Sequence, residues 1–393
     1  MERLYVPRDL EPRIKKAADQ FPVVVVTVPR QSGKSTLLTH LFPNARYITL
    51  DDPVLRRSAT EDPGLFLDRC PDGCIIDEVQ YAPGILPYIK MRADRDRSKT
   101  GVFLLTGSEV FPLMEGLSES LAGRAAIFEL LGISAGEYEV KGTDVASLFR
   151  RMFTGGYPDP LVHDVDRGIF YAGYVQTYLE RDVRHVENVQ DLVTFQQFLE
   201  LLAARVGGLL RLSELARDAG VSQPTARRWV SILETTRIVY LLRPFYRNIT
   251  KRTIKAPKVY FTDTGLLSYL LKYPDPNSLS SGPQAGAIFE NHVVIELLKE
   301  KLNHGHPYEL FFYRDSNRNE IDLVIDRGRN VQLCEVKLAK TIGRKHYESL
   351  TRLADEFPTP SLYLISMYPE PTGLTPTVEN VPFGEIARLA RGE

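Results

Sequence analysis

The feature that most constrains this chain is an apolar run that leads directly into a loop of the phosphate-binding type. Four valines at 23–26 predict a buried strand of a parallel sheet, and the loop after them ends in Gly33-Lys34-Ser35. Phosphate binding in such a loop needs backbone N–H groups, a lysine, and a hydroxyl for Mg²⁺ at the N-terminus of the next helix. The loop is therefore a candidate nucleotide site, and its residues are Pro29, Arg30, Gln31, Ser32, Gly33, Lys34, Ser35 and Thr36.

One position departs from the phosphate-loop pattern. Val28 stands where the pattern has glycine, and a β-branched residue resists a positive φ angle. We expect either weaker nucleotide affinity or a turn that is more tightly packed. A strand-to-helix turn that binds no ligand is the alternative for the whole loop.

A second apolar run, at 74–76, ends in two adjacent carboxylates, Asp77 and Glu78. Together with Ser35, Asp77 is expected to hold the Mg²⁺ shell, while Glu78 polarises the attacking water. Lys34 would bridge the terminal phosphates and take part in catalysis. These residues predict a metal-assisted phosphate-transfer site at one edge of the sheet.

Two further residues are candidates for catalysis. Ser108 follows the strand-like run at 102–105, and its hydroxyl would lie beside the terminal phosphate; a helix or turn cap is an equal alternative. Arg124 is a candidate arginine finger that reaches into a neighbouring subunit, with a plain surface arginine as the alternative.

Composition sets the outer limits of the interpretation. A chain of 393 residues predicts two or three domains, and 43% hydrophobic with 25% charged residues excludes a disordered or collagenous chain. The net charge of -1 gives no argument for a nucleic-acid partner. Three cysteines fit a reducing compartment, and no apolar run is long enough to span a membrane. We expect a cytoplasmic protein with no membrane partner and no signal peptide.

The C-terminal part carries a second group of charged residues. Asp322 is followed thirteen residues later, across an expected β-hairpin, by Glu335 and then Lys337. This arrangement matches the PD-(D/E)xK nuclease pattern, in which carboxylates hold a divalent cation and the lysine orients the hydroxide and phosphate. Glu290, on the preceding expected helix, is a candidate further ligand. The alternatives are a charged hairpin without metal and a domain that keeps the fold for binding alone.

The middle of the chain predicts a DNA-binding unit. A helix at 213–219, a turn at Gly220, a second helix after Ser222 and a strand at 238–242 follow the plan of a winged helix-turn-helix. Basic residues without acidic neighbours continue from 243 to 258. A solvated face used for subunit contacts is the alternative. The candidate DNA-binding residues are Gln223, Thr225, Arg227, Arg228, Arg247, Lys251 and Arg252.

Taken in order along the chain, these motifs resemble those of prokaryotic AAA-type ATPases that carry a C-terminal domain of unknown function. The resemblance includes the loop at 29–35, the strand end at 77–80, the segments at 105–108 and 118–124, and the runs at 178–183 and 260–267. It implies an α/β fold with five parts: an AAA-type P-loop ATPase core at 1–140, a helical segment at 141–205, a winged helix-turn-helix at 206–273, a linker at 274–286, and a restriction-endonuclease-like PD-(D/E)xK domain at 287–393. The nuclease pattern is also similar to that of archaeal Holliday-junction resolvases.

The combined expectation is a Mg²⁺-dependent ATPase that binds DNA and couples hydrolysis to its movement or remodelling, with branched DNA as one candidate form. ATP and Mg²⁺ are the expected cofactors, with a second divalent cation at the nuclease-like site as an open alternative. A homo-oligomer, such as a hexameric ring, is the expected assembly. The alternatives are an ATP-gated switch that acts on a protein partner through a non-catalytic C-terminal module, and an ATP-dependent metal nuclease.

Overall fold

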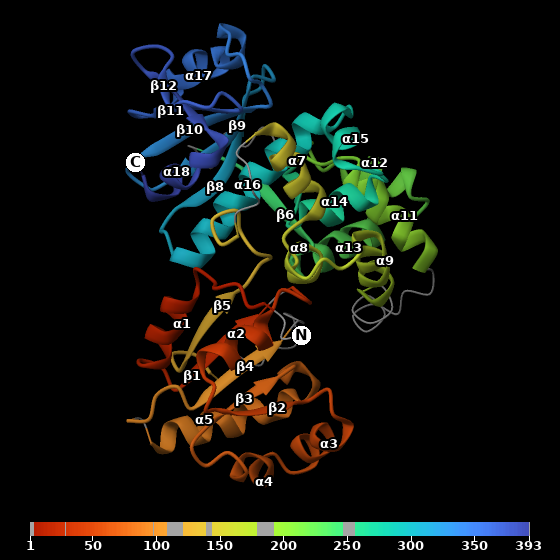
Figure 1. Ribbon diagram of the computed structural model, residues 1–393, viewed down its shortest axis with the longest axis vertical. Coiled ribbons are helices and arrows are strands. Elements are labelled where there is room, and N and C mark those ends of the chain that lie inside the picture. Colours follow the sequence, from red (N-terminus) through yellow and green to blue (C-terminus); the bar gives the residue numbers. More distant parts are fainter. Residues whose placement is uncertain are drawn as a thin grey trace. The chain divides into compact units, whose positions relative to one another are not determined.

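The chain folds into two compact units. The computed structural model describes residues 4–27, 29–96, 98–107, 121–138, 144–178, 192–246 and 256–392. Unit 1 comprises the chain up to Ile133 with the short pieces Thr235–Arg237 and Leu302–His304, and unit 2 comprises the rest (Figure 1). No helix within the described ranges is both long and apolar enough to cross a membrane.

Unit 1 is built on a parallel sheet with the strand order β2-β3-β4-β1-β5. Strand β4 follows β1 and β3 in sequence yet lies between them, which brings the ends of all three strands together. The expected α/β class with a parallel sheet is confirmed. The strands are β1 (Val23–Thr27), β2 (Arg46–Thr49), β3 (Cys74–Asp77), β4 (Phe103–Gly107) and β5 (Ala125–Glu129).

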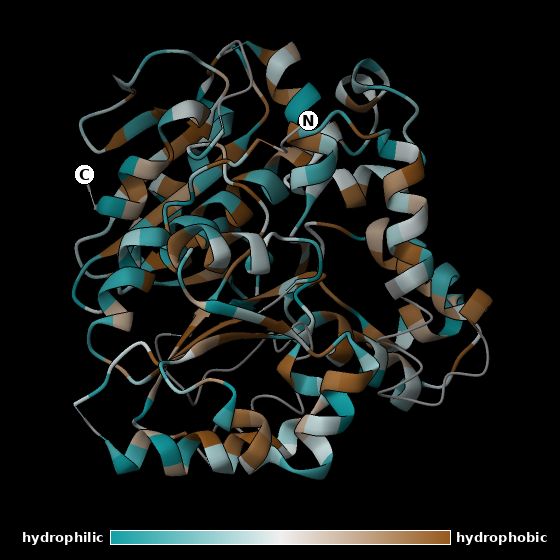
Figure 2. Cartoon of the chain, turned by 60° about the horizontal axis from the view of Figure 1, so that its bottom comes forward, coloured by the Kyte–Doolittle hydropathy of each residue, from teal (hydrophilic) through white to brown (hydrophobic). Residues whose placement is uncertain are grey.

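Both faces of this sheet are buried, which explains the unbroken valine run. Val23 and Val25 belong to one hydrophobic cluster and Val24 and Val26 to the other, as the alternation of a strand requires. In Figure 2 the strands are mainly brown, while the helices carry both brown and teal. Helices α1 (Glu11–Ala18) and α2 (Lys34–Leu41) supply one cluster, and α3 (Pro53–Glu61), α4 (Pro63–Asp68) and α5 (Leu86–Arg95) supply the other.

Unit 2 contains an eight-stranded sheet with the order β12-β13-β11-β10-β9-β8-β6-β7. The hairpin of β6 and β7 is therefore continuous with the C-terminal strands, through the parallel pairing of β6 with β8. Its strands are β6 (Val239–Pro244), β7 (Lys258–Phe261), β8 (Glu309–Arg314), β9 (Glu320–Asp326), β10 (Val331–Lys337), β11 (Ser361–Ser366), β12 (Thr372–Gly373) and β13 (Val378–Pro382).

The rest of unit 2 is mainly helical, and most of its helices come from the middle of the sequence. Trp229 of α13 packs edge-on against Phe195 and Phe198 of α11, with ring centroids 4.9 and 5.1 Å apart. The helices are α7 (Val145–Thr154), α8 (Pro158–Val162), α9 (Arg167–Tyr178), α11 (Leu192–Ala203), α12 (Leu212–Asp218), α13 (Gln223–Thr235), α14 (Thr264–Leu270), α15 (Pro276–Ser281), α16 (Ala285–His304), α17 (Glu348–Leu353) and α18 (Ala387–Arg391).

The segment 274–286, expected to be a linker, contains helix α15. Asp275 caps this helix by accepting hydrogen bonds from the backbone N–H groups of Asn277 and Ser278, and Pro276 occupies its first turn. Leu279 is fully buried. The segment is therefore a packed part of unit 2, and local capping, which hydrophobic periodicity does not reveal, is the physical reason.

Asp263 connects three segments of unit 2. Its buried carboxylate caps α14 through the Leu266 N–H (2.7 Å) and accepts from the Tyr171 hydroxyl (2.7 Å) and the Gly156 N–H (2.6 Å). A Cβ on Gly265 would lie 2.1 Å from the Tyr171 hydroxyl, so only glycine fits there. The motif at 260–267, singled out in the sequence, thus has a structural role in joining α9, α14 and the turn after α7.

We predict that Asp263→Ala lowers the free energy of unfolding by about 3 kcal/mol, because it leaves two backbone N–H groups without their acceptor and leaves the buried Tyr171 hydroxyl with the Thr154 carbonyl. Urea unfolding followed by the fluorescence of Trp229, the single tryptophan, measures the change. The matched control is Asp275→Ala, which removes only the cap of α15 and should cost less. Equal losses in the two variants would contradict the connecting role of Asp263.

Candidate nucleotide site

The phosphate loop lies at the carboxyl end of β1 and leads into α2. Gly33 adopts a left-handed conformation, with φ 91°, at the N-cap of α2, and Gln31 is also left-handed, with φ 58°. Left-handed residues between right-handed ones curve the backbone into a concave surface that suits an anion. The N-terminus of α2 adds the favourable end of its dipole. Val28 lies outside the described residues, so its effect on the turn stays a prediction.

Lys34 folds back over this loop. Its side chain is 6% exposed, and its Nζ donates to the Pro29 carbonyl at 2.7 Å. The Ser32 hydroxyl donates to the same carbonyl at 3.0 Å. An ammonium held inside the loop by a neutral carbonyl can exchange this partner for phosphate oxygens, which bind a cation more strongly. Of the other loop residues, Pro29 is buried, Arg30 is half-buried, and Gln31 and Thr36 are exposed.

Asp77, the last residue of β3, accepts hydrogen bonds from three hydroxyl groups. Ser35 Oγ donates to its Oδ1 at 2.8 Å, Tyr47 donates to its Oδ2 at 2.6 Å, and Thr106 also donates to Oδ1. Thr106 reaches Asp77 because β4 lies beside β3. The carboxylate is buried and faces the hydroxyl at the start of α2. Oxygen atoms of this kind are the ligands that Mg²⁺ prefers, and the structure brings the predicted Ser35 and Asp77 together, while their role as metal ligands stays a prediction.

Glu78 sits in a strained turn directly after β3. Its backbone is left-handed, with φ 56°, which is uncommon for a residue with a side chain. Its N–H donates to Thr106 Oγ1 at 3.2 Å, and its carboxylate accepts from the side-chain amide of Gln80. A carboxylate next to a candidate metal ligand can act as a general base.

Sequence reasoning missed several residues that support this site. Arg8, 6% exposed, donates to the Ser32 carbonyl at 3.1 Å and to the Leu131 carbonyl at 2.9 Å, so it ties the loop to the segment after β5. Burial and the hydrogen bond to Asp77 raise the pKa of Tyr47 above its ordinary range, so its phenol stays the donor. No sequence motif around Arg8 identifies it as part of this site. The adjacency of Thr106 depends on the strand order, which no motif states.

The other two candidate catalytic residues do not join the site. Ser108 lies outside the described residues. Arg124 precedes β5, at the amino edge of the sheet, where Val23 N–H donates to its carbonyl at 3.3 Å. Its guanidinium binds both oxygens of Asp94 on α5, at 2.7 and 3.0 Å. Arg124 is therefore remote from the phosphate loop of its own chain, and a role in a neighbouring subunit stays a prediction.

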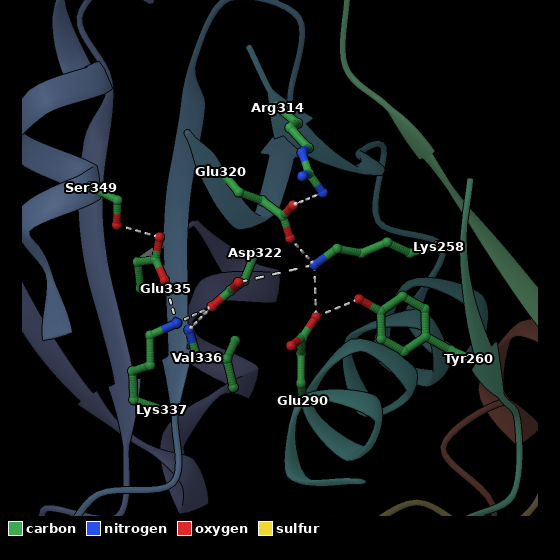
Figure 3. Close-up of polar contacts among 10 residues, drawn as sticks. All are labelled: Lys258, Tyr260, Glu290, Arg314, Glu320, Asp322, Glu335, Val336, Lys337 and Ser349. Carbon is green, nitrogen blue, oxygen red and sulfur yellow. Dashed lines mark hydrogen bonds and ion pairs between the residues drawn. The ribbon is translucent and has the colours of Figure 1, made fainter. Parts of the chain in front are cut away.

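The candidate residues of the C-terminal pattern do come together (Figure 3). Lys337 Nζ lies 2.7 Å from Asp322 Oδ2 and 2.6 Å from Glu335 Oε2. Burial disfavours the charged form of Asp322, yet Lys337 and Lys258 outweigh it and hold the pKa of Asp322 at about 2. Burial and then the charge of Asp322 raise the pKa of Glu335 to about 8. Burial likewise raises the pKa of Glu290. Sequence reasoning missed Lys258 and Glu320, which join this cluster.

The candidate DNA-binding residues are distributed over two segments. On α13, Gln223, Arg227 and Arg228 are exposed, and Thr225 is half-buried with its hydroxyl 2.8 Å from that of Ser222. Arg247, Lys251 and Arg252 lie outside the described residues. Lys258, counted with them as part of a basic stretch, is buried among carboxylates, so it is not available to DNA.

Sequence comparisons agree with this geometry. A family model described as an AAA domain matches residues 20–139, and two models of domains of unknown function, DUF8612 and DUF4143, match residues 145–277 and 285–386. Residues 20–139 are thus matched by an AAA domain, which supports the AAA-type ATPase part of the resemblance. The model for 285–386 describes no function, so the nuclease-like assignment stays a prediction.

Two curated proteins place the chain in a family. The uncharacterized protein Rv2008c of Mycobacterium tuberculosis is 33% identical over 338 residues, which cover 85% of this chain and 74% of that protein. The uncharacterized protein Mb2031c of Mycobacterium bovis has the same identity and coverage. The chain belongs to the family of these two proteins.

Solved structures are more distant. The Walker-type ATPase PABY2304 of Pyrococcus abyssi is 13% identical with a TM-score of 0.43, covering 67% of this chain and 94% of its own. A RuvB variant of Thermotoga maritima is 18% identical with a TM-score of 0.32, covering 60% of this chain and 88% of its own. The family assignment therefore rests on the sequence matches and not on these structures.

We predict that Glu78→Gln lowers the rate of ATP hydrolysis by about 100-fold or more, because the amide cannot accept a proton from the attacking water. ATP binding should stay within a factor of about three, since the phosphate loop is unchanged. Steady-state hydrolysis and titration with a fluorescent ATP analogue measure the two effects. Lys34→Ala should instead lose binding, and Arg57→Ala, an exposed change on α3, is the control. Loss of binding in Glu78→Gln would contradict a purely catalytic role.

Proposed function

We propose that this protein is a Mg²⁺-dependent ATP hydrolase whose nucleotide cycle acts on DNA bound by unit 2. The observation that carries the hydrolytic part is the contact of Ser35 with Asp77, with Lys34 inside the loop and Glu78 beside it. These four side chains come from the start of α2, the end of β3 and the turn directly after it, at one edge of the sheet of unit 1. The arrangement supports phosphate binding and water activation at the same place.

Each residue has a distinct task in this proposal. The loop N–H groups and Lys34 bind and orient the terminal phosphates, and Ser35 with Asp77 holds the metal shell. Mg²⁺, when bound with ATP, supplies positive charge against the charge that develops on the phosphates. Glu78 accepts the proton of the attacking water. Thr106 and Tyr47 hold the Asp77 carboxylate in position through their hydroxyl groups.

The proposed DNA contact is the exposed side of α13. Ala226, Trp229, Val230 and Leu233 are buried on one side of this helix, and the opposite side exposes Gln223, Arg227 and Arg228. Two arginines and an amide on an open helix face can neutralise phosphates and reach base edges in the major groove. The helix is also preceded by a short helix and followed by a β-hairpin, in the order the sequence predicts for a winged helix.

The proposal includes an oligomer, of which a hexameric ring is one form. Arg124 lies at the sheet edge opposite the phosphate loop of its own chain, so its guanidinium can act on ATP only in another copy. To do so it must leave Asp94, which at present binds it through two hydrogen bonds. Exchange of Asp94 for a phosphate would link nucleotide state to subunit contact.

A second candidate function is an ATP-gated switch that acts on a protein partner. The observation that favours it is the ionic cluster at the C-terminal sheet, where lysines rather than open positions face the carboxylates. A C-terminal domain with such a cluster fits a binding module better than a cleavage site. Release of a co-purified protein on addition of ATP is the result that would favour this function.

We predict that duplex, single-stranded or four-way-junction DNA stimulates ATP hydrolysis, and that replacing Arg227 and Arg228 together by alanine removes the stimulation. Loss of two phosphate contacts should also reduce the slope of log affinity against log salt by about two. The measurements are steady-state hydrolysis and fluorescence anisotropy of labelled DNA at several salt concentrations.

The matched control replaces Lys15 and Lys16, two adjacent exposed cations on α1, by alanine. This variant removes the same charge from the other unit and should keep the stimulation. Hydrolysis that no DNA form changes, together with DNA binding that neither double variant weakens, would contradict the proposal and favour the protein-partner switch.

A further inference from the structure

Four carboxylates converge in unit 2 from three elements. Glu320 and Asp322 lie two residues apart on β9 and so project from one face, Glu335 lies on β10, and Glu290 comes from α16 (Figure 3). Their side chains are between 4% and 27% exposed. Carboxylates this close and this buried repel one another, so the fold must supply positive charge or protons.

Lysine side chains supply that charge. Lys337 lies between Asp322 and Glu335, as its place in the nuclease pattern requires. Lys258 fills the other side: its Nζ lies 2.6 Å from Glu320, 3.1 Å from Glu290 and 4.0 Å from Asp322. The side chain of Lys258 is only 3% exposed. An ammonium in contact with three carboxylates stands where a divalent cation would otherwise bind them.

Further donors also contact these carboxylates. Tyr260 donates to Glu290 at 2.6 Å, and Arg314 donates to Glu320 at 3.1 Å. Asp322 accepts from the Val336 N–H at 3.0 Å, and Glu335 accepts from Ser349. Four carboxylates thus face three cationic groups, two hydroxyls and a backbone N–H. This set leaves little unbalanced negative charge to attract a further cation.

With Lys258 in place, the oxygen geometry does not suit a metal either. One ion would need several oxygens about 2.0–2.6 Å from its centre. Within the described parts of the chain, no three acidic side chains of this cluster have oxygens that all lie within 4.8 Å of one another. The expected ligand set of Glu290, Asp322 and Glu335 therefore does not fit a metal ion in this arrangement.

Lys258 reaches the cluster from a distant strand. In the sheet order, β8 and β6 separate β9 from β7, which carries Lys258 and Tyr260. The Lys258 ammonium lies 5.6 Å from the ring of Phe312 on β8, consistent with a side chain that crosses over that strand. Its contacts join the outer strand β7 to α16 and to the middle of the sheet. Removing them would separate elements as well as charges.

We propose that Lys258 is a built-in cation that takes the place of a divalent metal, so that the cluster is a structural brace of β7, α16 and β9 and not a metal centre. This inference concerns the C-terminal cluster alone and is independent of the DNA function proposed above. It makes the nuclease-like domain a non-cleaving module in the native protein. Supercoiled plasmid should stay intact with Mg²⁺ or Mn²⁺, whereas nicking that Asp322→Ala abolishes would overturn the proposal.

The decisive test is Lys258→Met, which keeps an unbranched side chain up to Cε and removes the ammonium group with its charge. In full-length protein without nucleotide or DNA and with EDTA, we expect the melting midpoint of unit 2, followed by Trp229 fluorescence, to fall by about 10 °C. Millimolar Ca²⁺ should restore at least half of this loss, because the freed carboxylates can then bind the ion. The wild-type midpoint should not respond to Ca²⁺.

Two controls isolate the cluster. In the double variant Lys258→Met with Asp322→Asn, the recovery with Ca²⁺ should disappear. Lys272→Met, which breaks an exposed contact with Glu200, should show neither the fall nor the recovery. Failure of Ca²⁺ to restore Lys258→Met would contradict the placement of Lys258 at a cation position.

A measurement on the native protein decides the question even if Lys258→Met does not fold. Free Mn²⁺ is measured by electron paramagnetic resonance during titration of nucleotide-free wild type and Asp322→Asn. Equal binding by the two proteins supports the brace. An additional bound Mn²⁺ in wild type that Asp322→Asn loses would show a metal centre and overturn the proposal.

Discussion

The nucleotide site depends on one carboxylate, Asp77, and on the strand order that gives it its neighbours. Because β4 is placed between β1 and β3, the hydroxyl of Thr106 meets Asp77 from the side, while Ser35 meets it from the start of α2. The hydrogen bonds of Asp77 thus connect β2, β3, β4 and α2, with Tyr47 as the contribution of β2. Ser35 and Glu78, whose N–H donates to Thr106, both lie at this junction, so a different strand order would separate these residues without altering any motif.

Carboxylates also lie close together in the C-terminal sheet, but their hydrogen-bond and ionic partners differ from those of Asp77. Asp77 is held by neutral hydroxyl groups, which can remain beside a metal or give way to it at little electrostatic cost. In the other cluster the partners are ammonium groups, and a divalent cation would have to displace a buried like charge. Whether a carboxylate cluster can accept a metal therefore depends less on the number of acidic residues than on whether their hydrogen-bond donors are neutral hydroxyl groups or charged ammonium groups.

This difference also marks what sequence can and cannot predict. Contiguous signals were readable: the valine run predicted a buried strand, and the motifs pointed to Lys34 and Ser35, which lie at the start of α2, and to Asp77 and Glu78, which lie at the end of β3 and directly after it. Contacts between distant residues had no such signal, so Arg8 and Thr106 were missed. Lys258 was misread because a run of basic residues hides which member points inward. The segment 274–286 was misread because its helix depends on a cap at Asp275 and on the burial of Leu279.

The position of Lys258 changes how unit 2 can respond to a ligand. The hairpin of β6 and β7 is joined to the C-terminal strands by sheet pairing and by a buried ionic contact, so the α13 surface and the C-terminal sheet belong to one compact unit. Separating them would break β6–β8 hydrogen bonds and expose paired charges together, which makes independent motion costly. A ligand that binds α13 would therefore affect the stability of the whole of unit 2. The structural role proposed for the C-terminal cluster would need no metal and no cleavage in such a unit.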